Sequence, residues 1–472
     1  MRNKLIAAIA VTGLLSFSGS VMAGTMEMLG ASSRGTAMGG AMVSIASGSE
    51  STYYNPSSLA LSPDSWSVEY SSISAEMMLN DENNMPGGTG VRFGFSRRFL
   101  RDRLGLGLLV GMSPSSAGLS LDFGSLSGGG APNWSWAMYK DNMPLLLNFG
   151  FGVRITDWLS VGLSGGQRDS LVSMGYFPVV VDPILESLIG ISTGAMPTNV
   201  ESYNFTVGSE PDSDMTYGFN VNFRTDYVSL GYLYKPEVWS RYKLRVELVG
   251  GGGSLLPNSQ YILMDMKIPG QVETTVYGGA GHIPIPWNDG TLTLAYAHEV
   301  QNWSGFYPRS VQYQWEANDT FSSDWFEYAE PRDPGLEDVE LDRFGLEYEG
   351  DATKLTFGKL KSPRFYVRGG YYHWDSPQPE DVKHDWQVGM VDSDADFYSF
   401  GLGLSFARKS AQVKDPLSSP RVQVDFHYQQ ADMEDRDYSI QPDKFSNVPL
   451  DNYYVQTEGS LSQYGLQVTW WQ

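Results

Sequence analysis

The 472-residue chain is rich in aromatic residues and glycine, poor in charged residues, and strongly acidic. Aromatic residues make up 13% and charged residues 18%, and there are 52 glycines, which is typical of a β-rich protein with many turns. The formal net charge of −22 argues against nucleic acid as a partner. The absence of cysteine excludes thiolate catalysis and cysteine-ligated zinc.

The first 23 residues have the pattern of a secretory signal peptide. Positive residues open the segment, an apolar run follows at 5–17, and a small-x-Ala motif stands at 21–23. The apolar run is too short for a spanning helix, which needs about 20 residues, and no longer apolar stretch follows. We therefore expect cleavage near Ala23 and export of a mature chain that begins at Gly24.

Most of the mature chain alternates large apolar residues with small or polar ones. Trp66, Val68 and Tyr70, for example, are separated by Ser67 and Glu69. Similar segments lie at 91–95, 104–112, 145–153, 159–163, 215–223, 228–234, 242–248, 292–296, 365–371, 398–406, 422–428 and 464–470. Strands that face lipid on one side and a lumen on the other have this period, and open sheet edges cannot face lipid. The sequence thus predicts an all-β fold, a closed antiparallel transmembrane β-barrel over residues 63–472.

The connections between these segments are short and long in turn, as in outer-membrane barrels. Short turns are expected at 156–158 and 224–226, and long connections near 113–142, 170–212, 305–340 and 430–460. The stretch 177–190 is apolar for a loop. It could pack on the barrel mouth or act as a docking surface for an apolar ligand.

Residues 24–62 differ from the rest, because they lack the alternation and are rich in Gly, Ala, Ser and Met. We expect them to form an N-terminal hatch that plugs the lumen. Within this segment, 33–43 reads Ser-Arg-Gly-Thr-Ala-Met-Gly-Gly-Ala-Met-Val, and Asn55-Pro56-Ser57 follows. These stretches resemble the hatch of the FadL long-chain fatty-acid transporter family, which carries an Asn-Pro-Ala motif where this chain has Ser57. Weaker matches lie at 303–304, 368–379 and 398–403.

The resemblance implies a barrel of about 14 strands with the hatch inside, in the outer membrane of a Gram-negative cell. It also implies passive inward uptake of long-chain fatty acids or another hydrophobic ligand, with sideways release through a wall gap at a kinked strand. Aromatic hydrocarbons are an alternative substrate class, and a non-transport scaffold or shuttle for secreted proteins is a third possibility. The expected surroundings are outer-membrane lipid and lipopolysaccharide, and the expected state is a monomer without a cofactor or metal.

Three groups of residues are candidates for ligand binding and gating: Asn55, Pro56 and Ser57; Gly105 and Gly107; and Met26, Met28 and Leu29. The first group could form a rigid bend that gates the hatch or an ordinary turn before the first strand. The two glycines could mark a strand kink beside a lateral gap or simply be small lumen-facing residues. The last group could be a flexible apolar segment that touches ligand or part of the packing of the hatch.

The sequence gives little support for catalysis. The close His–acid neighbours are His373 with Asp375 and His384 with Asp385, and neither pair has a serine motif beside it. Acidic pairs such as Glu337-Asp338 are typical of solvated loops. We therefore predict that the protein is not an enzyme.

Overall fold

The computed structural model describes residues 30–79, 82–83, 88–112, 145–169, 175–177, 200–209, 216–250, 260–305, 310–317, 321–322, 326–327, 335–377, 379–380, 393–407, 421–440 and 453–472. The expected signal peptide, Met26, Met28 and Leu29 lie outside these residues, as do the loop 113–142, most of the apolar stretch 177–190, and His384 with Asp385. Among the described residues, no helix has the length and apolar character needed to cross a membrane.

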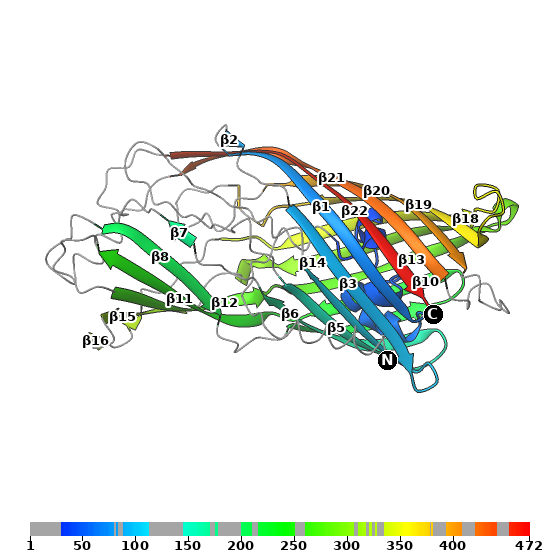
Figure 1. Ribbon diagram of the computed structural model, residues 1–472, viewed down its shortest axis with the longest axis horizontal. Coiled ribbons are helices and arrows are strands. Elements are labelled where there is room, and N and C mark those ends of the chain that lie inside the picture. Colours follow the sequence, from blue (N-terminus) through cyan, green and yellow to red (C-terminus); the bar gives the residue numbers. More distant parts are fainter. Residues whose placement is uncertain are drawn as a thin grey trace.

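The barrel wall is one sheet of fourteen antiparallel strands, which confirms the predicted fold class. It closes because β3 pairs with β1 as well as with β4. Figure 1 shows these strands running side by side around the long axis of the molecule. The wall strands are β1 (Ser65–Leu79), β3 (Gly88–Phe99), β4 (Leu104–Met112), β5 (Leu145–Arg154), β6 (Leu159–Asp169), β9 (Thr216–Arg224), β10 (Val228–Lys235), β13 (Glu273–Ile285), β14 (Gly290–Asn302), β18 (Val339–Asp351), β19 (Lys361–Trp374), β20 (Ala395–Ala407), β21 (Arg421–Ile440) and β22 (Tyr453–Trp471).

A second sheet continues beyond the wall at one end of the barrel (Figure 1). It consists of β7 (Gly175–Phe177), β8 (Val200–Ser209), β11 (Val238–Gly250), β12 (Gln260–Gln271), β15 (Ser310–Ala317), β16 (Phe321–Ser322) and β17 (Phe326–Glu327), while β2 (Glu82–Asn83) pairs with β1. The predicted strand at 242–248 therefore exists, but it belongs to this sheet and not to the wall. The stretches 170–212 and 305–340, which we expected to be long loops, contain several of these strands.

The prediction of a long loop at 430–460 is wrong. β21 and β22 remain hydrogen-bonded from Arg421↔Trp471 out to Ile440↔Tyr453, with one register shift between Met433 and Arg436. The apolar alternation ends earlier than the ladder does, since the outer part carries polar residues such as Asp435 and Asp437. Backbone pairing does not require apolar side chains once a strand has left the lipid, so the hydrophobic pattern underestimates strand length there.

The outer surface of the wall is apolar, and its residues alternate with buried ones along each strand. β10, for instance, has exposed Val228, Leu230 and Tyr232 alternating with buried Ser229, Gly231 and Leu233. Similar outward side chains, such as Trp66, Phe93 and Phe400, lie on most wall strands. A continuous apolar exterior of this kind matches the lipid-facing band of a transmembrane barrel.

The two ends of the barrel differ in their connections. At one end, here called the short-turn end, turns at 100–103, 155–158, 225–227, 286–289 and 352–360 join neighbouring strands. The opposite end, called the long-loop end, carries the longer connections and the second sheet. The described part of the N-terminal segment lies inside the barrel nearer the short-turn end (Figure 1).

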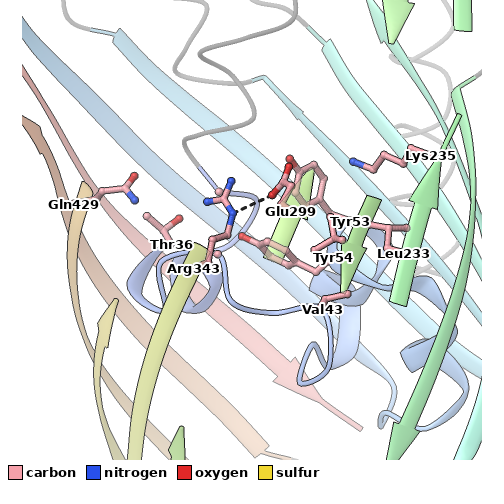
Figure 2. Close-up of a pocket in the computed structure, with 12 residues that line it drawn as sticks. Thr36, Val43, Tyr53, Tyr54, Leu233, Lys235, Glu299, Arg343 and Gln429 are labelled. Carbon is pink, nitrogen blue, oxygen red and sulfur yellow. Dashed lines mark hydrogen bonds and ion pairs between the residues drawn. The ribbon is translucent and has the colours of Figure 1, made fainter. Parts of the chain in front are cut away.

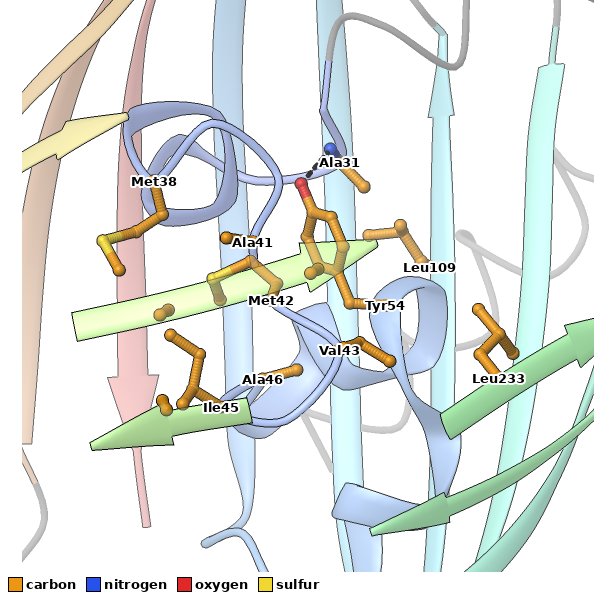
Figure 3. Close-up of a cluster of buried hydrophobic side chains, with 13 residues drawn as sticks. Ala31, Met38, Ala41, Met42, Val43, Ile45, Ala46, Tyr54, Leu109 and Leu233 are labelled. Carbon is orange, nitrogen blue, oxygen red and sulfur yellow. Dashed lines mark hydrogen bonds between the residues drawn. The ribbon is translucent and has the colours of Figure 1, made fainter. Parts of the chain in front are cut away.

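Residues 30–62 form this internal segment, which we call the hatch, and β1 begins three residues later at Ser65. Its short helices are α3 (Ser33–Ala37), η1 (Gly48–Glu50), α4 (Ser51–Tyr54) and η2 (Pro56–Ala60). Figure 3 shows Met38, Met42 and Ile45 of the hatch packed in one apolar cluster that also includes Leu109 and Leu233 from the wall. The hatch therefore shares a core with the barrel, as the sequence predicted for a plug.

Candidate functional site

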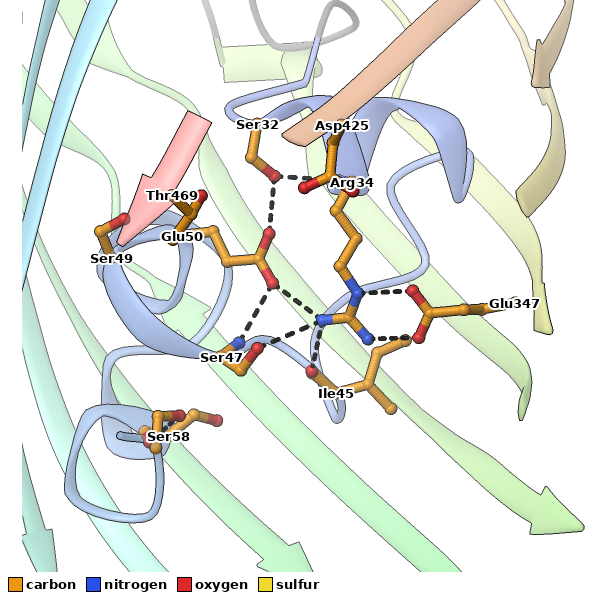
Figure 4. A network of polar contacts seen from close by, with 12 residues as sticks. Ser32, Arg34, Ile45, Ser47, Ser49, Glu50, Ser58, Glu347, Asp425 and Thr469 are labelled. Carbon is orange, nitrogen blue, oxygen red and sulfur yellow. Dashed lines mark hydrogen bonds and ion pairs between the residues drawn. The ribbon is translucent and has the colours of Figure 1, made fainter. Parts of the chain in front are cut away.

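The hatch is attached to the wall by an ionic network around Arg34. The Arg34 guanidinium donates to both carboxylate oxygens of Glu347 on β18, at 2.9 Å each, and to Glu50 in the hatch at 2.9 Å (Figure 4). Glu347 also accepts from Arg368 at 2.6 Å, and Arg368 pairs with Asp425 on β21 at 2.6 Å. One arginine of the hatch is thus linked to three strands of the wall.

Charge balance keeps this network ionised in a place that water reaches poorly. The Arg34 side chain is 15% exposed and that of Glu347 is 9% exposed. Burial alone would lower the pKa of Arg34, but the attraction of Glu347 and Glu50 raises it well above its ordinary value. Arg34 therefore stays cationic, and removing it would leave the buried carboxylate of Glu50 without its cation and that of Glu347 with Arg368 alone.

A second polar contact holds the start of the hatch. The Ser33 amide donates to Gln467 on β22 at 2.8 Å, and its hydroxyl donates to Glu69 on β1 at 3.2 Å. Arg92 on β3 pairs with the same Glu69 and also donates to the carbonyl of Gly30. β3, β1 and β22 are neighbours in the closed wall, and all three contact the start of the hatch at this point.

Asn55 connects two parts of the hatch with the wall. Its amide nitrogen donates to the carbonyl of Val43 at 2.6 Å and to the carbonyl of Val221 on β9 at 3.1 Å. Its side-chain oxygen accepts from the amide and hydroxyl of Ser57. Pro56 then occupies the first position of η2, where its missing N–H leaves no hydrogen bond unmade. The motif therefore lies inside the lumen and fixes hatch geometry, while its part in gating stays a prediction.

Gly105 and Gly107 lie at one of the places where the hatch comes close to the wall. A Cβ atom at Gly105 would overlap the backbone of Leu59, and one at Gly107 would overlap Thr52. β4 pairs with β3 and with β5 along its whole length without a register shift. The two residues are thus small lumen-facing positions that admit the hatch, and a role in sideways release stays a prediction.

This fit predicts a selective cost for adding a methyl group on β4. Gly105→Ala should force η2 away from the wall and destabilise the folded barrel by about 1–3 kcal/mol, the usual cost of overpacking. Gly281→Ala on β13 is the matched control, because a Cβ there meets nothing within 4 Å. Thermal unfolding in detergent compares the two, and equal midpoints would contradict the proposed fit.

A pocket lies between the hatch and the wall on the side that faces the long-loop end (Figure 2). Its empty volume is about 560 Å³, part of it open to solvent. The lining residues come from the hatch and from five wall strands: Gly30, Thr36, Gly40, Val43, Tyr53, Tyr54, Leu233, Lys235, Val276, Glu299, Arg343 and Gln429. None of them was among the candidate binding residues of the sequence analysis. Lumen-facing residues of the wall are polar or apolar without a regular pattern, and the hatch residues lie outside the alternating strands.

The lining of the pocket combines apolar surface with positive charge. Tyr53 and Tyr54 meet edge to face with ring centres 5.0 Å apart, and Val43, Leu233 and Val276 lie beside them. The ammonium of Lys235 is 5.2 Å from the ring centre of Tyr53. Arg343 donates to Glu299 at 2.9 Å and lies 4.4 Å from the ring centre of Tyr372. An apolar ligand with one polar end fits such a lining better than a fully polar solute does.

His373 belongs to a polar cluster with Asp375 and Asp396. His373 contacts Asp375 at 3.2 Å and Asp396 at 3.0 Å, and Tyr371 donates to the same Asp396. Tyr371 and Tyr398 on the neighbouring strands point outward, so this cluster lies on the outer face of the wall and away from the pocket. Within the described ranges, no group of three or more His, Asp or Glu side chains could hold a metal ion.

Comparison with known proteins finds similar structures but no similar sequences. No protein-family model and no curated protein matches the sequence. The solved structure of a Pseudomonas aeruginosa FadL homologue superposes with a TM-score of 0.59 at 12% identity, covering 96% of this chain and 99% of the homologue. The Pseudomonas putida toluene transporter TodX matches with a TM-score of 0.54 at 12% identity, covering 94% of this chain and 99% of TodX. The CymD monoaromatic hydrocarbon channel matches with a TM-score of 0.52 at 10% identity, covering 95% of this chain and 99% of CymD. These matches establish a shared fold over nearly the whole chain.

Proposed function

We propose that this chain is a FadL-like channel of the outer membrane that takes up hydrophobic molecules by passive diffusion past a movable hatch. The proposal is supported by the apolar exterior of the fourteen-stranded wall and by the hatch that fills the lumen. The shared fold with a FadL homologue and two hydrocarbon channels points in the same direction. By analogy with outer-membrane barrels, the short-turn end faces the periplasm and the long-loop end faces the medium.

The observation that carries the proposal is the pocket beside the hatch. A ligand that enters from the long-loop end reaches Tyr53, Leu233 and Val276 before it meets the closed part of the hatch. Burial of its apolar surface at about 25 cal/mol per Å² would hold it there. Because the pocket is built half from hatch residues, binding in it changes the contacts that keep the hatch in place.

Among hydrophobic molecules, long-chain fatty acids fit this lining best. Their carboxylate matches the positive charge of Lys235, and their tail matches the aliphatic and aromatic side chains below it. Aromatic hydrocarbons are the second candidate, since Tyr53 and Tyr54 offer an aromatic edge-to-face pair and two structural neighbours are named for aromatic substrates. A scaffold or shuttle for secreted proteins would make no use of the pocket.

The test is uptake of labelled oleate and of labelled toluene by a deletion strain with and without the gene. We expect the gene to raise oleate uptake more than toluene uptake. Equal uptake of both compounds with and without the gene would remove the transport proposal. A rise in toluene uptake alone would reassign the substrate to the aromatic class.

Lys235→Met separates the two substrate classes. The variant keeps most of the length and the unbranched apolar stem of the side chain but removes its charge. We expect oleate uptake at limiting concentration to fall about tenfold, the effect of one lost charge-assisted contact, while toluene uptake stays unchanged. A fall for both compounds would mean that Lys235 shapes the pocket and does not recognise a carboxylate.

A further inference from the structure

Two turns at the short-turn end are positively charged, although the chain as a whole is acidic. Residues 354–364 contain four Lys or Arg and no Asp or Glu, in a chain whose formal net charge is −22. Residues 97–103 contain four Arg and one Asp. The first segment spans the turn from β18 to β19, and the second spans the turn from β3 to β4. Two separate turns on this end therefore share the same unusual charge.

Large apolar side chains project into solvent from the same turns. Leu100 is 70% exposed, Phe357 is 86% exposed, and Trp287 in the adjacent turn from β13 to β14 is 83% exposed. The turns that hold Trp287 and Phe357 are neighbours, because β14 pairs with β18 and because Asp289 pairs with Arg364. Such exposure in water is unfavourable, so these side chains need an apolar environment that the protein itself does not provide.

The backbone adds a second reason to regard Leu100 and Phe357 as selected residues. Leu100 has φ of 49° and Phe357 has φ of 51°, both in the left-handed region where glycine is at no disadvantage. A turn that needed only this conformation would favour Gly, Asn or Asp there. A bulky apolar residue in a disfavoured conformation with its side chain exposed indicates a contact outside the protein.

The surroundings of these turns match a lipid interface. Phe99 and Trp158 are exposed at the same end, where the outward apolar band of β3 and of the β5–β6 hairpin finishes. The guanidinium of Arg97 on the outward face of β3 lies 5.5 Å from the ring centre of Phe99. Aromatic rings next to cations are characteristic of the level where acyl chains meet headgroups, and anionic lipids attract such cations.

We propose that the short-turn end binds the anionic phospholipid headgroups of the leaflet it faces. Lys354, Lys359 and Lys361, all exposed, contact the phosphates, and the side chains of Leu100 and Phe357 insert among the adjacent acyl chains. Neither Lys354 nor Lys359 forms an ion pair with any residue that the structure describes, so no described carboxylate neutralises their charge. This surface is separate from the pocket and does not depend on what the channel transports.

The first test measures lipid selectivity of the full chain in phosphatidylcholine vesicles that contain a trace of spin-labelled phosphatidylglycerol or spin-labelled phosphatidylcholine. We expect the protein to immobilise the phosphatidylglycerol label preferentially at low salt and less so at high salt. The triple variant Lys354→Gln, Lys359→Gln, Lys361→Gln should lower this preference by about twofold or more. If the unmodified chain shows no preference for phosphatidylglycerol, the lipid assignment is overturned, and an acidic protein becomes the candidate partner of this surface.

The matched control changes three charges at the opposite end. Glu340→Gln, Asp342→Asn and Asp432→Asn alter exposed carboxylates near the long-loop end, so the preference for phosphatidylglycerol should stay unchanged or rise slightly. If neutralising the three lysines has no effect, or if the control lowers the preference equally, the turn is not the binding surface.

The second test measures insertion depth, and the absence of cysteine makes it direct. A nitroxide attached to a Phe357→Cys variant in phosphatidylcholine–phosphatidylglycerol vesicles should be more accessible to oxygen than to a water-soluble nickel complex. A nitroxide on Asp435→Cys, an exposed position on β21 near the long-loop end, should show the reverse. Preferential access of the nickel complex at position 357 would overturn the proposed insertion.

Discussion

Oxidising a Ser49→Cys, Ser67→Cys double variant is expected to stop uptake of hydrophobic molecules, and reducing it should restore uptake. Ser49 lies in η1 of the hatch and Ser67 lies on β1 of the wall, and their hydroxyl oxygens are 2.7 Å apart. Side chains this close can be bridged by a disulfide with little backbone movement. Because the native chain has no cysteine, the bridge would be the only cross-link between hatch and wall apart from the backbone that runs from the hatch into β1.

The expected effect is large because the lock acts on the movable part itself. If the hatch must leave its place for ligand to pass, a covalent link prevents the step that limits transport. We expect labelled oleate uptake under oxidising conditions to fall to the level of the deletion strain. A second lock, Ser44→Cys with Ser229→Cys, joins another part of the hatch to β10, where the oxygens are 3.4 Å apart.

The matched control links two wall strands and adds no cross-link to the hatch, whose Ser49 amide donates to the Ser65 hydroxyl at 2.8 Å. The Ser65 and Ser96 hydroxyls on β1 and β3 are 2.9 Å apart, and a Ser65→Cys, Ser96→Cys bridge should not change uptake. The gel mobility of a chain cleaved between the two cysteines verifies each cross-link. If both variants with a cross-linked hatch then show normal uptake, ligand passes without hatch movement. Loss of uptake in the wall control as well would mean that the disulfide damages the barrel.

The wall could be predicted from the sequence because lipid and lumen impose opposite requirements on alternate residues. In each such strand, as in β10 with Leu230 and Tyr232, the apolar side chains must face lipid. Because every strand has this requirement and no edge may stay open, the alternation predicts a closed cylinder. The second sheet was not predicted, because its strand at 242–248 alternates like a wall strand and was assigned to the wall, while its other strands are held by backbone hydrogen bonds without a clear alternation. A pattern of apolar residues cannot report pairing that does not depend on them.

The site could be predicted only where it depends on local chemistry. Asn55 and Pro56 form a recognisable turn unit, and the structure places them in the hatch where they join Val43 to β9. Gly105 and Gly107 were recognised as unusual, but the reason for them is the approach of Leu59 and Thr52, which are distant in sequence. The partners of Arg34 could not be predicted, because Glu347 is 313 residues away and a charge in a strand does not reveal what it pairs with.

One signal for the ionic network was nevertheless present in the sequence. Arg368 stands between Val367 and Gly369 on β19, and Glu347 stands between Leu346 and Tyr348 on β18. Charged residues at inward positions of transmembrane strands face the lumen, where they must find partners of opposite sign. Arg34 is the first arginine after the expected cleavage site, within a segment expected to fill that lumen. Matching inward carboxylates with hatch cations would have proposed the correct kind of contact, though not the individual pair.

Arg34→Met is therefore expected to give a leaky channel. The substitution keeps an unbranched side chain but leaves Glu50 without its cation and Glu347 with Arg368 alone, and breaking a buried ion pair costs about 3–5 kcal/mol. A hatch destabilised by about 3 kcal/mol would be displaced roughly a hundredfold more often. Ion conductance across planar bilayers measures this directly, and the variant should conduct where the unmodified chain is closed.

Two further variants separate loss of the network from loss of a charge. Arg364→Met removes an arginine that pairs with exposed Asp289 and part-exposed Glu349 at the short-turn end, so it should cost less than about 1 kcal/mol and produce no leak. Arg34→Met combined with Glu50→Gln removes a buried charge of each sign, and it should conduct less than Arg34→Met alone because the carboxylate that lost its cation is gone. If the double variant conducts more, or if Arg34→Met stays closed, apolar packing around Met38 and Met42 holds the hatch and the ionic network does not.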